Sequence, residues 1–250
     1  MRHFGLAGFP LEHSFSPGYF NSKFKQKNIT GCKYELYPVR EAGQIRHLFE
    51  TDPNLEGLNI TIPWKQEVIK YLDILDDTAK EAGAVNVIRA RRSGAGLLLE
   101  GFNTDVYGFI VSLPDDIKED TDRALILGSG GASAAVACAL RLLDISYYVV
   151  SRHPARDKII YEELTAEMIS GSKLIINTTP VGMFPDTEAK PPLDYDLLSH
   201  NNFLYDLVYN PAVTKFMEEG VRRGCRVMNG QNMLESQADR AWDIWNSTDL

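Results

Sequence analysis

Positive charge is scarce in this chain of 250 residues, which has 26 Lys and Arg residues against 34 Asp and Glu residues. The formal net charge is −8. Nucleic acids and anionic membrane surfaces bind proteins through basic patches, so this balance argues against both kinds of partner. We therefore expect a small-molecule ligand that finds local positive charge on the protein.

Cysteine is also rare: the chain has Cys32, Cys138 and Cys225, and no C-x-x-C pair. An odd number without metal-ligand spacing indicates neither a disulfide framework nor a zinc site, so we expect no metal and interpret all three as small buried hydrophobes. The sequence also lacks an apolar run of membrane-spanning length and an N-terminal segment patterned like a secretory leader. It therefore predicts a cytoplasmic protein.

A glycine-rich turn between two strand-like runs is the strongest local feature. Residues 124–127 and 146–150 are predicted strands, and residues 132–143 between them are rich in helix formers. The turn reads Gly128-Ser129-Gly130-Gly131-Ala132-Ser133. Glycines that open a helix after a strand can cradle a phosphate, so we predict a dinucleotide site, although Ser133 replaces the third glycine of G-x-G-x-x-G. The alternative is a purely structural turn.

The end of the second strand indicates which dinucleotide binds. An NAD enzyme has Asp or Glu about 20 residues past the glycines, whereas this chain has Ser151-Arg152, with Arg156 following. Guanidinium groups suit a 2′-phosphate, so the sequence predicts NADP. Alternatively, both arginines are ordinary solvated charges.

The first hundred residues alternate between strand-like and helix-like segments. We expect strands at 3–8, 33–39, 55–62 and 97–102, a strand opening at 84–86, helices at 17–27, 41–50 and 66–73, and a turn at 91–96. Polar clusters adjoin these strands: Ser14 and Ser16, Asn59-Ile60-Thr61-Ile62-Pro63-Trp64-Lys65, Asn86, and Asn103-Thr104-Asp105. Lys65 beside a threonine and an amide suggests a reactive site at the carboxyl end of a parallel sheet. The alternatives are that the serines cap the helix at 17–27 and that Lys65 is a surface lysine.

The pattern predicts an α/β protein of two domains. A helix at 105–113 and a charged loop at 114–122 lead into the glycine turn, and further strands at 174–177, 203–208 and 225–228 indicate a doubly wound Rossmann-type sheet. Residues 231–246 carry apolar side chains at helical spacing, so we expect this helix to return to the first domain. The predicted domains are residues 1–104 with 231–250 for substrate, and 105–230 for NADP.

Several motifs in one order resemble the shikimate dehydrogenase family: N-x-T-x-P-x-K at Asn59–Lys65, G-A-V-N at Gly83–Asn86, N-T-D at Asn103–Asp105, and the glycine turn. The resemblance spans nearly the whole chain. It implies NADP-dependent, reversible reduction of 3-dehydroshikimate to shikimate in aromatic amino-acid biosynthesis. His153-Pro154 departs from the family, which more often has a threonine after the arginine.

Carried over residue by residue, the resemblance assigns roles to specific positions. It implies Lys65 and Asp105 as the catalytic pair, without deciding how the two divide the work. The substrate residues are Ser14, Ser16, Thr61, Asn86, Tyr209 and Gln237. The cofactor residues are Gly128, Ser129, Gly130, Gly131, Ala132, Ser133, Ser151, Arg152, Arg156, Thr178 and Gly230. No metal is implied.

Two rival functions stay open from the sequence alone. One is a quinate/shikimate dehydrogenase, which often prefers NAD, and the other is a non-catalytic NADP-binding sensor on the same fold. The chain is expected to be a monomer or a homodimer.

Overall fold

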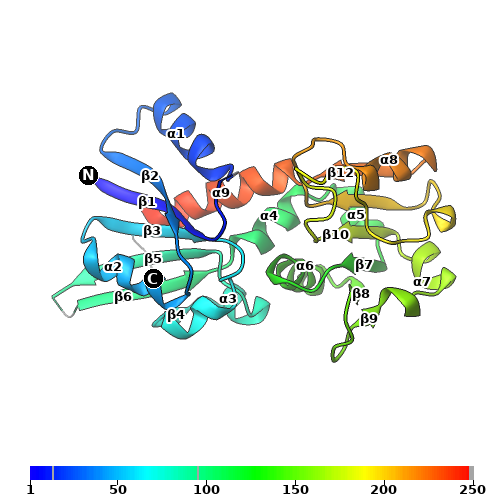
Figure 1. Cartoon of the computed structure of the whole chain (residues 1–250), viewed down its shortest axis with the longest axis horizontal. Coiled ribbons are helices and arrows are strands. Elements are labelled where there is room, and N and C mark those ends of the chain that lie inside the picture. The colour runs from blue at the N-terminus through cyan, green and yellow to red at the C-terminus, as the bar shows by residue number, and fades with distance from the viewer. Residues whose placement is uncertain (13, 95, 248–250) are drawn as a thin grey trace. The chain divides into compact units, whose positions relative to one another are not determined.

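The computed structural model of the chain describes residues 1–12, 14–94 and 96–247 (Figure 1). It divides into two compact units, one formed by Met1–Thr104 with the chain from Ala238 onward, the other by Asp105–Gln237. Both units combine a six-stranded sheet with helices, which confirms the predicted two-domain α/β class. The first unit ends at Thr104 and takes up the C-terminal helix again from Ala238.

The sheet of the first unit is mixed, with strand order β2-β1-β3-β5-β6-β4. Its strands are β1 (Arg2–Gly8), β2 (Cys32–Pro38), β3 (Leu55–Ile60), β4 (Ile74–Leu75), β5 (Val87–Ser93) and β6 (Gly96–Phe102). Its helices are α1 (Ser16–Gln26), α2 (Gly43–Thr51), the 3₁₀ helix η1 (Glu67–Tyr71) and α3 (Asp77–Ala82). Strands β1, β2 and β3 are mutually parallel, whereas β5 runs antiparallel to both β3 and β6.

Two local predictions for this unit need correction. The segment at 66–73 is the short 3₁₀ helix η1 rather than a longer helix. The turn predicted at 91–96 is shorter, because β5 continues to Ser93 and β6 restarts at Gly96, while residue 95 lies outside the described residues.

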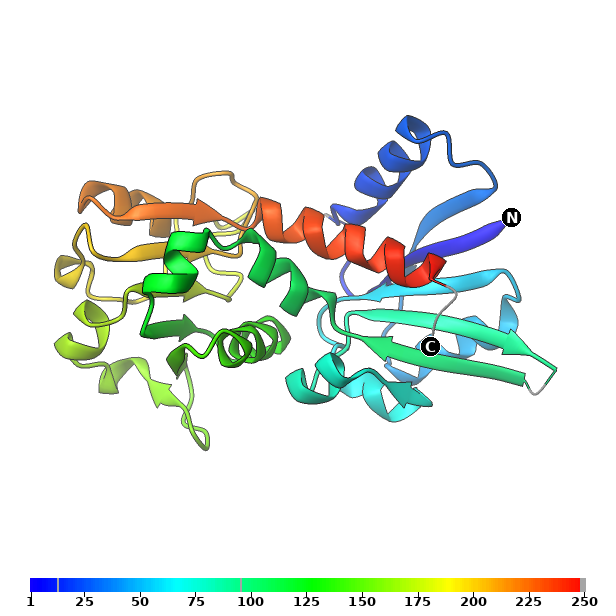
Figure 2. The same ribbon diagram turned by 180° about the vertical axis from the view of Figure 1, so that it is seen from behind.

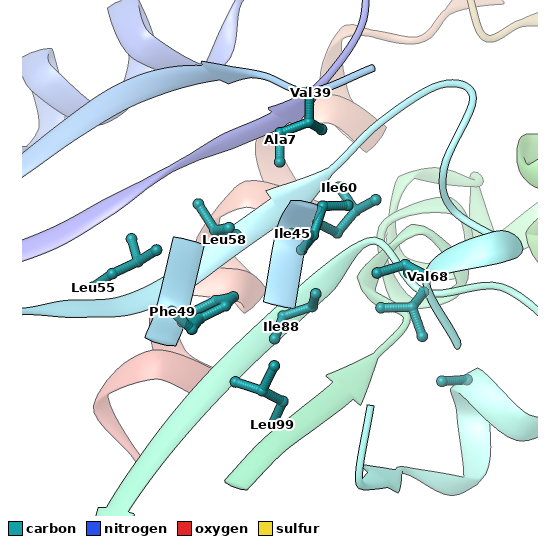
Figure 3. Close-up of a cluster of buried hydrophobic side chains, with 12 residues drawn as sticks. Ala7, Val39, Ile45, Phe49, Leu55, Leu58, Ile60, Val68, Ile88 and Leu99 are labelled. Atoms are coloured by element: carbon teal, nitrogen blue, oxygen red, sulfur yellow. The ribbon is translucent and has the colours of Figure 1, made fainter. Parts of the chain in front are cut away.

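One face of this sheet packs against α2. Ile45 and Phe49 are one helical turn apart, so they project from the same side of α2 onto the sheet. Figure 3 shows them next to Leu58 and Ile60 of β3 and Ile88 of β5. The cluster is fully or nearly fully buried, so α2 is held by its apolar face.

The opposite face is covered by α1 and by the C-terminal part of α9 (Gln231–Asn246) (Figure 2). Trp245 stacks on Phe4 of β1, and its Nε1 donates to the Ile88 carbonyl at 3.0 Å. A Cβ on Gly57 would lie 2.2 Å from the Trp245 indole, so only glycine admits the ring here. The last helix therefore does return to the first unit, as the sequence predicts.

The second unit contains a doubly wound parallel sheet, with strand order β12-β11-β10-β7-β8-β9. Its strands are β7 (Arg123–Leu127), β8 (Ser146–Ser151), β9 (Ile159–Ile160), β10 (Leu174–Asn177), β11 (Phe203–Asp206) and β12 (Arg226–Asn229). Its helices are α4 (Thr104–Ser112), α5 (Asp115–Asp120), α6 (Gly131–Leu142), α7 (Ala166–Ser170) and α8 (Lys215–Arg222), with 3₁₀ helices η2 (Tyr161–Glu163) and η3 (Tyr195–Leu197). This order reverses between β7 and β10, the switch point at which Rossmann folds bind dinucleotides.

The loop predicted at 114–122 is wrong, since it contains α5. Only Ile117 of this helix is buried, so it lacks the apolar stripe that periodicity detects. The strand predicted at 203–208 ends at Asp206, because the Val208 N–H donates to the Asp206 carboxylate instead of to a neighbouring strand. None of the helices within the described part of the chain has the length and apolar character needed to cross a bilayer.

Candidate functional site

The way in which β3, β5 and β6 pair places the predicted substrate residues Thr61 and Asn86 at one edge of the first sheet. Thr61 directly follows β3, and Asn59 at the end of β3 pairs with Val87 at the start of β5. Val87 in turn pairs with Phe102 at the end of β6. Asn86, which precedes β5, and Asn103, which follows β6, therefore lie at the same edge as Thr61.

Backbone hydrogen bonds hold the segment that carries Lys65 at this edge. The Thr61 N–H donates to the Ala7 carbonyl at 3.0 Å, and the Val85 N–H donates to the Lys65 carbonyl at 2.7 Å. Between them, Trp64 Nε1 donates to the Val39 carbonyl at 2.9 Å. Lys65 is half-buried. Its backbone is thus anchored on two sides, which suits a side chain that acts at a defined place.

Asn86 fixes the chain immediately before Asp105. Its Oδ1 accepts from the Thr104 N–H at 2.7 Å, and its Nδ2 donates to Thr104 Oγ1 at 3.0 Å. Asn103 Nδ2 donates to the Ala84 carbonyl at 2.8 Å. Asp105 stands in the first turn of α4 and is 6% exposed. A carboxylate there is favoured by the partial positive charge of a helix N-terminus.

The two serines follow β1 at the same edge. The residue that caps α1 is Phe15, without a side-chain capping bond, so the structure does not favour the alternative that the serines serve as caps. The Ser16 side chain instead hydrogen-bonds the Tyr34 hydroxyl, which donates to Asn59 Oδ1 at 2.8 Å. Burial raises the pKa of Tyr34, so it stays a neutral donor. Ser16 is thereby connected to the polar edge of the sheet.

The glycine turn of the second unit has the geometry of a phosphate cradle. Gly128 has φ +115°, and a Cβ there would lie 2.6 Å from Thr178 Oγ1. Gly130 precedes α6 in extended conformation, and a Cβ on it would meet no atom within 4 Å. The first turn of α6 holds no acidic residue. An uncompensated helix N-terminus beside open space suits an anionic phosphate.

Thr178 and Ser151 flank this turn from the neighbouring strands. The Thr178 N–H and hydroxyl both donate to the Leu127 carbonyl, at 2.9 and 2.8 Å. Ser151 Oγ lies 3.5 Å from Ser129 Oγ and donates to the His153 carbonyl at 2.8 Å. The structure thus brings Gly128, Ser129, Ser151 and Thr178 together. Ser133, in place of the third glycine, is 2% exposed inside α6 and fits its packing.

The predicted 2′-phosphate residues lie beyond β8 on an exposed segment. Arg152 is exposed, and Arg156 is 95% exposed and forms a surface ion pair with Asp157 at 3.5 Å. An exposed guanidinium group can bind a ligand. An ordinary surface arginine is exposed in the same way, so exposure does not distinguish the two interpretations. The assignment of both residues to the cofactor therefore stays a prediction.

The remaining predicted residues follow β11 and β12. Gly230 permits a close approach, since a Cβ there would lie 2.2 Å from the Leu207 carbonyl oxygen. Tyr209 is half-buried, and burial raises its pKa. Gln237 lies on α9, where a Cβ on Gly108 would come within 3.0 Å of the Gln237 Cβ. Helix α4, which carries Asp105, therefore packs directly against α9.

Sequence reasoning missed three buried polar residues that organise these loops: Tyr34, Asn177 and Asp206. From the sequence, Asp206 is part of a predicted strand and Asn177 is the end of another, and neither is assigned a role. Asparagine followed by two threonines after a strand is a weak turn signal, since an Asx side chain commonly bonds the backbone two residues on.

A hollow at the other edge of the second sheet, before β10, β11 and β12, has no place in this site. It is lined by residues that include Asp116, Asp120, Lys173 and Arg226. Its charges already pair with one another, Arg226 with Asp116 and Lys173 with Asp120. Within the described residues, no cluster of three or more His, Cys, Asp or Glu side chains could hold a metal ion.

The chain joins a Rossmann unit to a second α/β unit whose Lys65, Thr61 and Asn86 lie at one edge of its sheet. Dinucleotide-dependent dehydrogenases have this organisation. Comparison with known proteins narrows this class. Residues 6–88 match the shikimate dehydrogenase substrate-binding domain. A curated shikimate dehydrogenase (NADP(+)) of Clostridium beijerinckii is 38% identical over 260 residues, which cover 100% of this chain and 94% of that protein. The chain belongs to the shikimate dehydrogenase family.

Solved structures agree with this assignment. Shikimate dehydrogenase 1 of Peptoclostridium difficile has a TM-score of 0.84 at 33% identity, covering 100% of this chain and 93% of that one. Shikimate 5-dehydrogenase of Thermus thermophilus, solved in complex with NADP(H) and shikimate, has a TM-score of 0.83 at 30% identity, covering 98% and 94%.

Proposed function

We propose that this protein reversibly reduces 3-dehydroshikimate to shikimate with NADPH, a step of aromatic amino-acid biosynthesis. The observation that carries the proposal is that Thr61, Lys65 and Asn86 lie at one sheet edge, and that Asn86 is hydrogen-bonded to Thr104, the residue before Asp105. Full-length relatives named shikimate dehydrogenase (NADP(+)) support the choice of substrate and cofactor.

The cradle at the start of α6 holds the NADP pyrophosphate in this proposal. Its fit rests on the open space beside Gly130 and on a helix N-terminus without a countering acid. Arg152 and Arg156 are assigned to the 2′-phosphate, and Ser151, Thr178 and Gly230 to the rest of the cofactor. When bound, NADPH supplies the hydride for the substrate ketone.

Lys65 and Asp105 handle the proton. Charge that develops on the ketone oxygen needs a nearby donor, which the Lys65 ammonium provides. Asp105, held by the Asn86–Thr104 bonds, orients the same hydroxyl. In the oxidative direction a neutral Lys65 takes the proton back.

The substrate ring is recognised by hydroxyl and amide groups. We assign Ser14 and Ser16 to the carboxylate, because hydroxyls donate well to an anion. The ring hydroxyls are assigned to Thr61, Asn86, Tyr209 and Gln237, which can both donate and accept.

The direct test is loss of NADPH absorbance when 3-dehydroshikimate is added to purified protein. We expect turnover with 3-dehydroshikimate and NADPH, and much slower oxidation of quinate with either NAD or NADP. Faster turnover of quinate with NAD would favour the quinate/shikimate dehydrogenase instead. NADPH binding without turnover of any shikimate-like ring would favour the sensor.

We also propose that the protein works in the cytoplasm as a monomer or homodimer, without nucleic-acid or membrane partners. The net charge of −8 supports the absence of nucleic-acid and membrane partners, because a negatively charged protein has no overall attraction to these anionic surfaces. Size-exclusion chromatography with light scattering measures the oligomeric state.

A further inference from the structure

Asp206, the last residue of β11, is a fully buried carboxylate bonded only to neutral donors. Asn177 Nδ2 and the Val208 N–H donate to its Oδ1 at 2.9 and 3.0 Å, and Thr214 Oγ1 donates to its Oδ2 at 2.6 Å. No cation among the described residues pairs with it. A buried charge without a counter-ion is costly, so its retention needs a reason.

The first donor connects Asp206 to the loop after β10. A carboxylate can only accept, so it fixes the Asn177 amide with Nδ2 toward Asp206. The Asn177 Oδ1 then faces Thr179, whose N–H and hydroxyl donate to it at 3.0 and 2.6 Å. Asn177 Nδ2 also donates to the Val181 carbonyl at 3.3 Å. The shape of residues 178–181 therefore depends on the carboxylate.

The other two donors connect Asp206 to the loop after β11. Val208 begins this loop and Thr214 ends it as the cap of α8, where its hydroxyl accepts from the Met217 N–H. Asp206 thus binds both ends of the segment that contains Tyr209. The two loops also join each other, since the Phe184 N–H donates to the Asn210 carbonyl at 3.0 Å.

We propose that Asp206 is a positioning residue whose carboxylate clamps residues 178–183 and 207–214, and so holds Thr178 and Tyr209 for cofactor and substrate. This inference rests on the proposed function, because Thr178 and Tyr209 take their roles from it. Asp206 touches neither ligand in this account and acts through the loops.

The clamp is sensitive to protonation. Burial raises the pKa of Asp206 to about 6, although the bonds from Thr214, Val208 and Asn177 lower it. Tyr195 of η3 is a titratable group that interacts electrostatically with Asp206. Its own burial raises the pKa of Tyr195, and the charges of Glu219, Tyr161 and Asp206 raise it further, so Tyr195 stays neutral. Below about pH 6 the carboxyl gains a proton and must donate where it accepted before, which weakens the clamp.

Stability should follow the opposite trend. A carboxyl whose pKa is raised in the folded state favours folding when protonated, so this contribution is fully present below about pH 4 and is lost as the pH rises through about 6. The ionised form is therefore kept at a cost in stability. A buried carboxylate that is kept although it lowers stability is expected at a functional site.

The test compares Asp206→Asn with wild type, using Asp186→Asn as the matched control. Asn keeps the shape but places an N–H donor against Thr214, where the protonated acid would place an O–H donor. Asp186 is an exposed carboxylate on the neighbouring loop. At pH 8 we expect D206N to raise the KM for 3-dehydroshikimate about tenfold, as for one charge-assisted hydrogen bond. The kcat and the melting temperature should not fall, and D186N should match wild type.

Two readouts separate positioning from general damage. The KM ratio of D206N to wild type should shrink to about twofold at pH 5, where about nine-tenths of wild-type Asp206 is protonated. Amide exchange in residues 178–183 and 207–214 should be faster in D206N than in wild type at pH 8. A pH-independent ratio, unchanged exchange, or a fall in kcat and melting temperature together overturns the proposal. Wild type without turnover would refute the proposed function, while amide exchange still decides the clamp.

Discussion

Gly128 and Gly130 stand two residues apart in the cofactor turn, yet alanine should act differently at each. At Gly130 the backbone has φ −90° and ψ −166°, which alanine adopts without strain, and the new Cβ meets no atom within 4 Å. The remaining cost to stability is the loss of a favourable N-cap residue, about 0.5–1 kcal/mol. The space that the methyl group fills is where the proposed pyrophosphate approaches the backbone.

At Gly128 the fold itself resists the substitution. Positive φ costs a non-glycine residue about 1–2 kcal/mol. The Cβ would also displace Thr178 Oγ1, which lies 2.6 Å away and bonds the Leu127 carbonyl, at a further cost of about 1 kcal/mol. The sum, about 2–3 kcal/mol, corresponds to a fall in melting temperature of about 4–12 °C.

The assay pairs NADPH titration by fluorescence with a thermal melt of each variant. Gly130→Ala should raise the Kd for NADPH about tenfold or more while the melting temperature falls by only a few degrees. Gly128→Ala should lose both affinity and stability. If Gly130→Ala binds NADPH like wild type, the turn is structural and the cofactor lies elsewhere.

Three further substitutions test the other assignments. Arg152→Ala should weaken the binding of NADPH by about 1.5–3 kcal/mol and leave the binding of NADH nearly unchanged. Equal losses of affinity in titrations with the two cofactors would show that the arginine has a structural role. Ser16→Ala should raise the substrate KM about tenfold without changing NADPH affinity, whereas lower thermal stability with an unchanged KM would restore the capping role. Lys65→Ala and Asp105→Asn should each lower kcat by about 10² to 10⁴, and the double variant little more than the worse single one. Losses that multiply in this kinetic cycle would show two independent contacts.

The fold could be predicted where apolar side chains repeat with a clear period. The bounds of α9, Gln231–Asn246, follow from its apolar spacing, and β7, α6 and β8 follow from the run around the glycine turn. Helix α5 was not predicted because it buries only one residue. Strands β4 and β9 were not predicted because a strand of two residues is too short to show a period. Periodicity reports burial along the chain, so elements that bury little leave no trace in it.

The site was harder, because its geometry depends on strand direction and on distant partners. Asn86 precedes a strand, and in a parallel sheet that would place it at the opposite edge from Thr61. The antiparallel run of β5 brings it to the same edge. The predicted turn at 91–96 indicates the direction of β5 relative to β6, but not its pairing with β3. Asp206 likewise meets Asn177 from 29 positions away. Residue types suggested the chemistry, while pairing between strands decided which side chains meet.

Transfer of hydride from the nicotinamide to the substrate ketone is the central claim, and isotope transfer tests it most directly. Purified protein is mixed with 3-dehydroshikimate and NADPH deuterated at both C4 positions, and the product is examined by mass spectrometry. We predict shikimate that is heavier by one deuterium on the carbon of the new alcohol, and about a hundredfold less product, or still less, from Lys65→Ala in the same time. Shikimate without the label, or no shikimate from wild type, would contradict it.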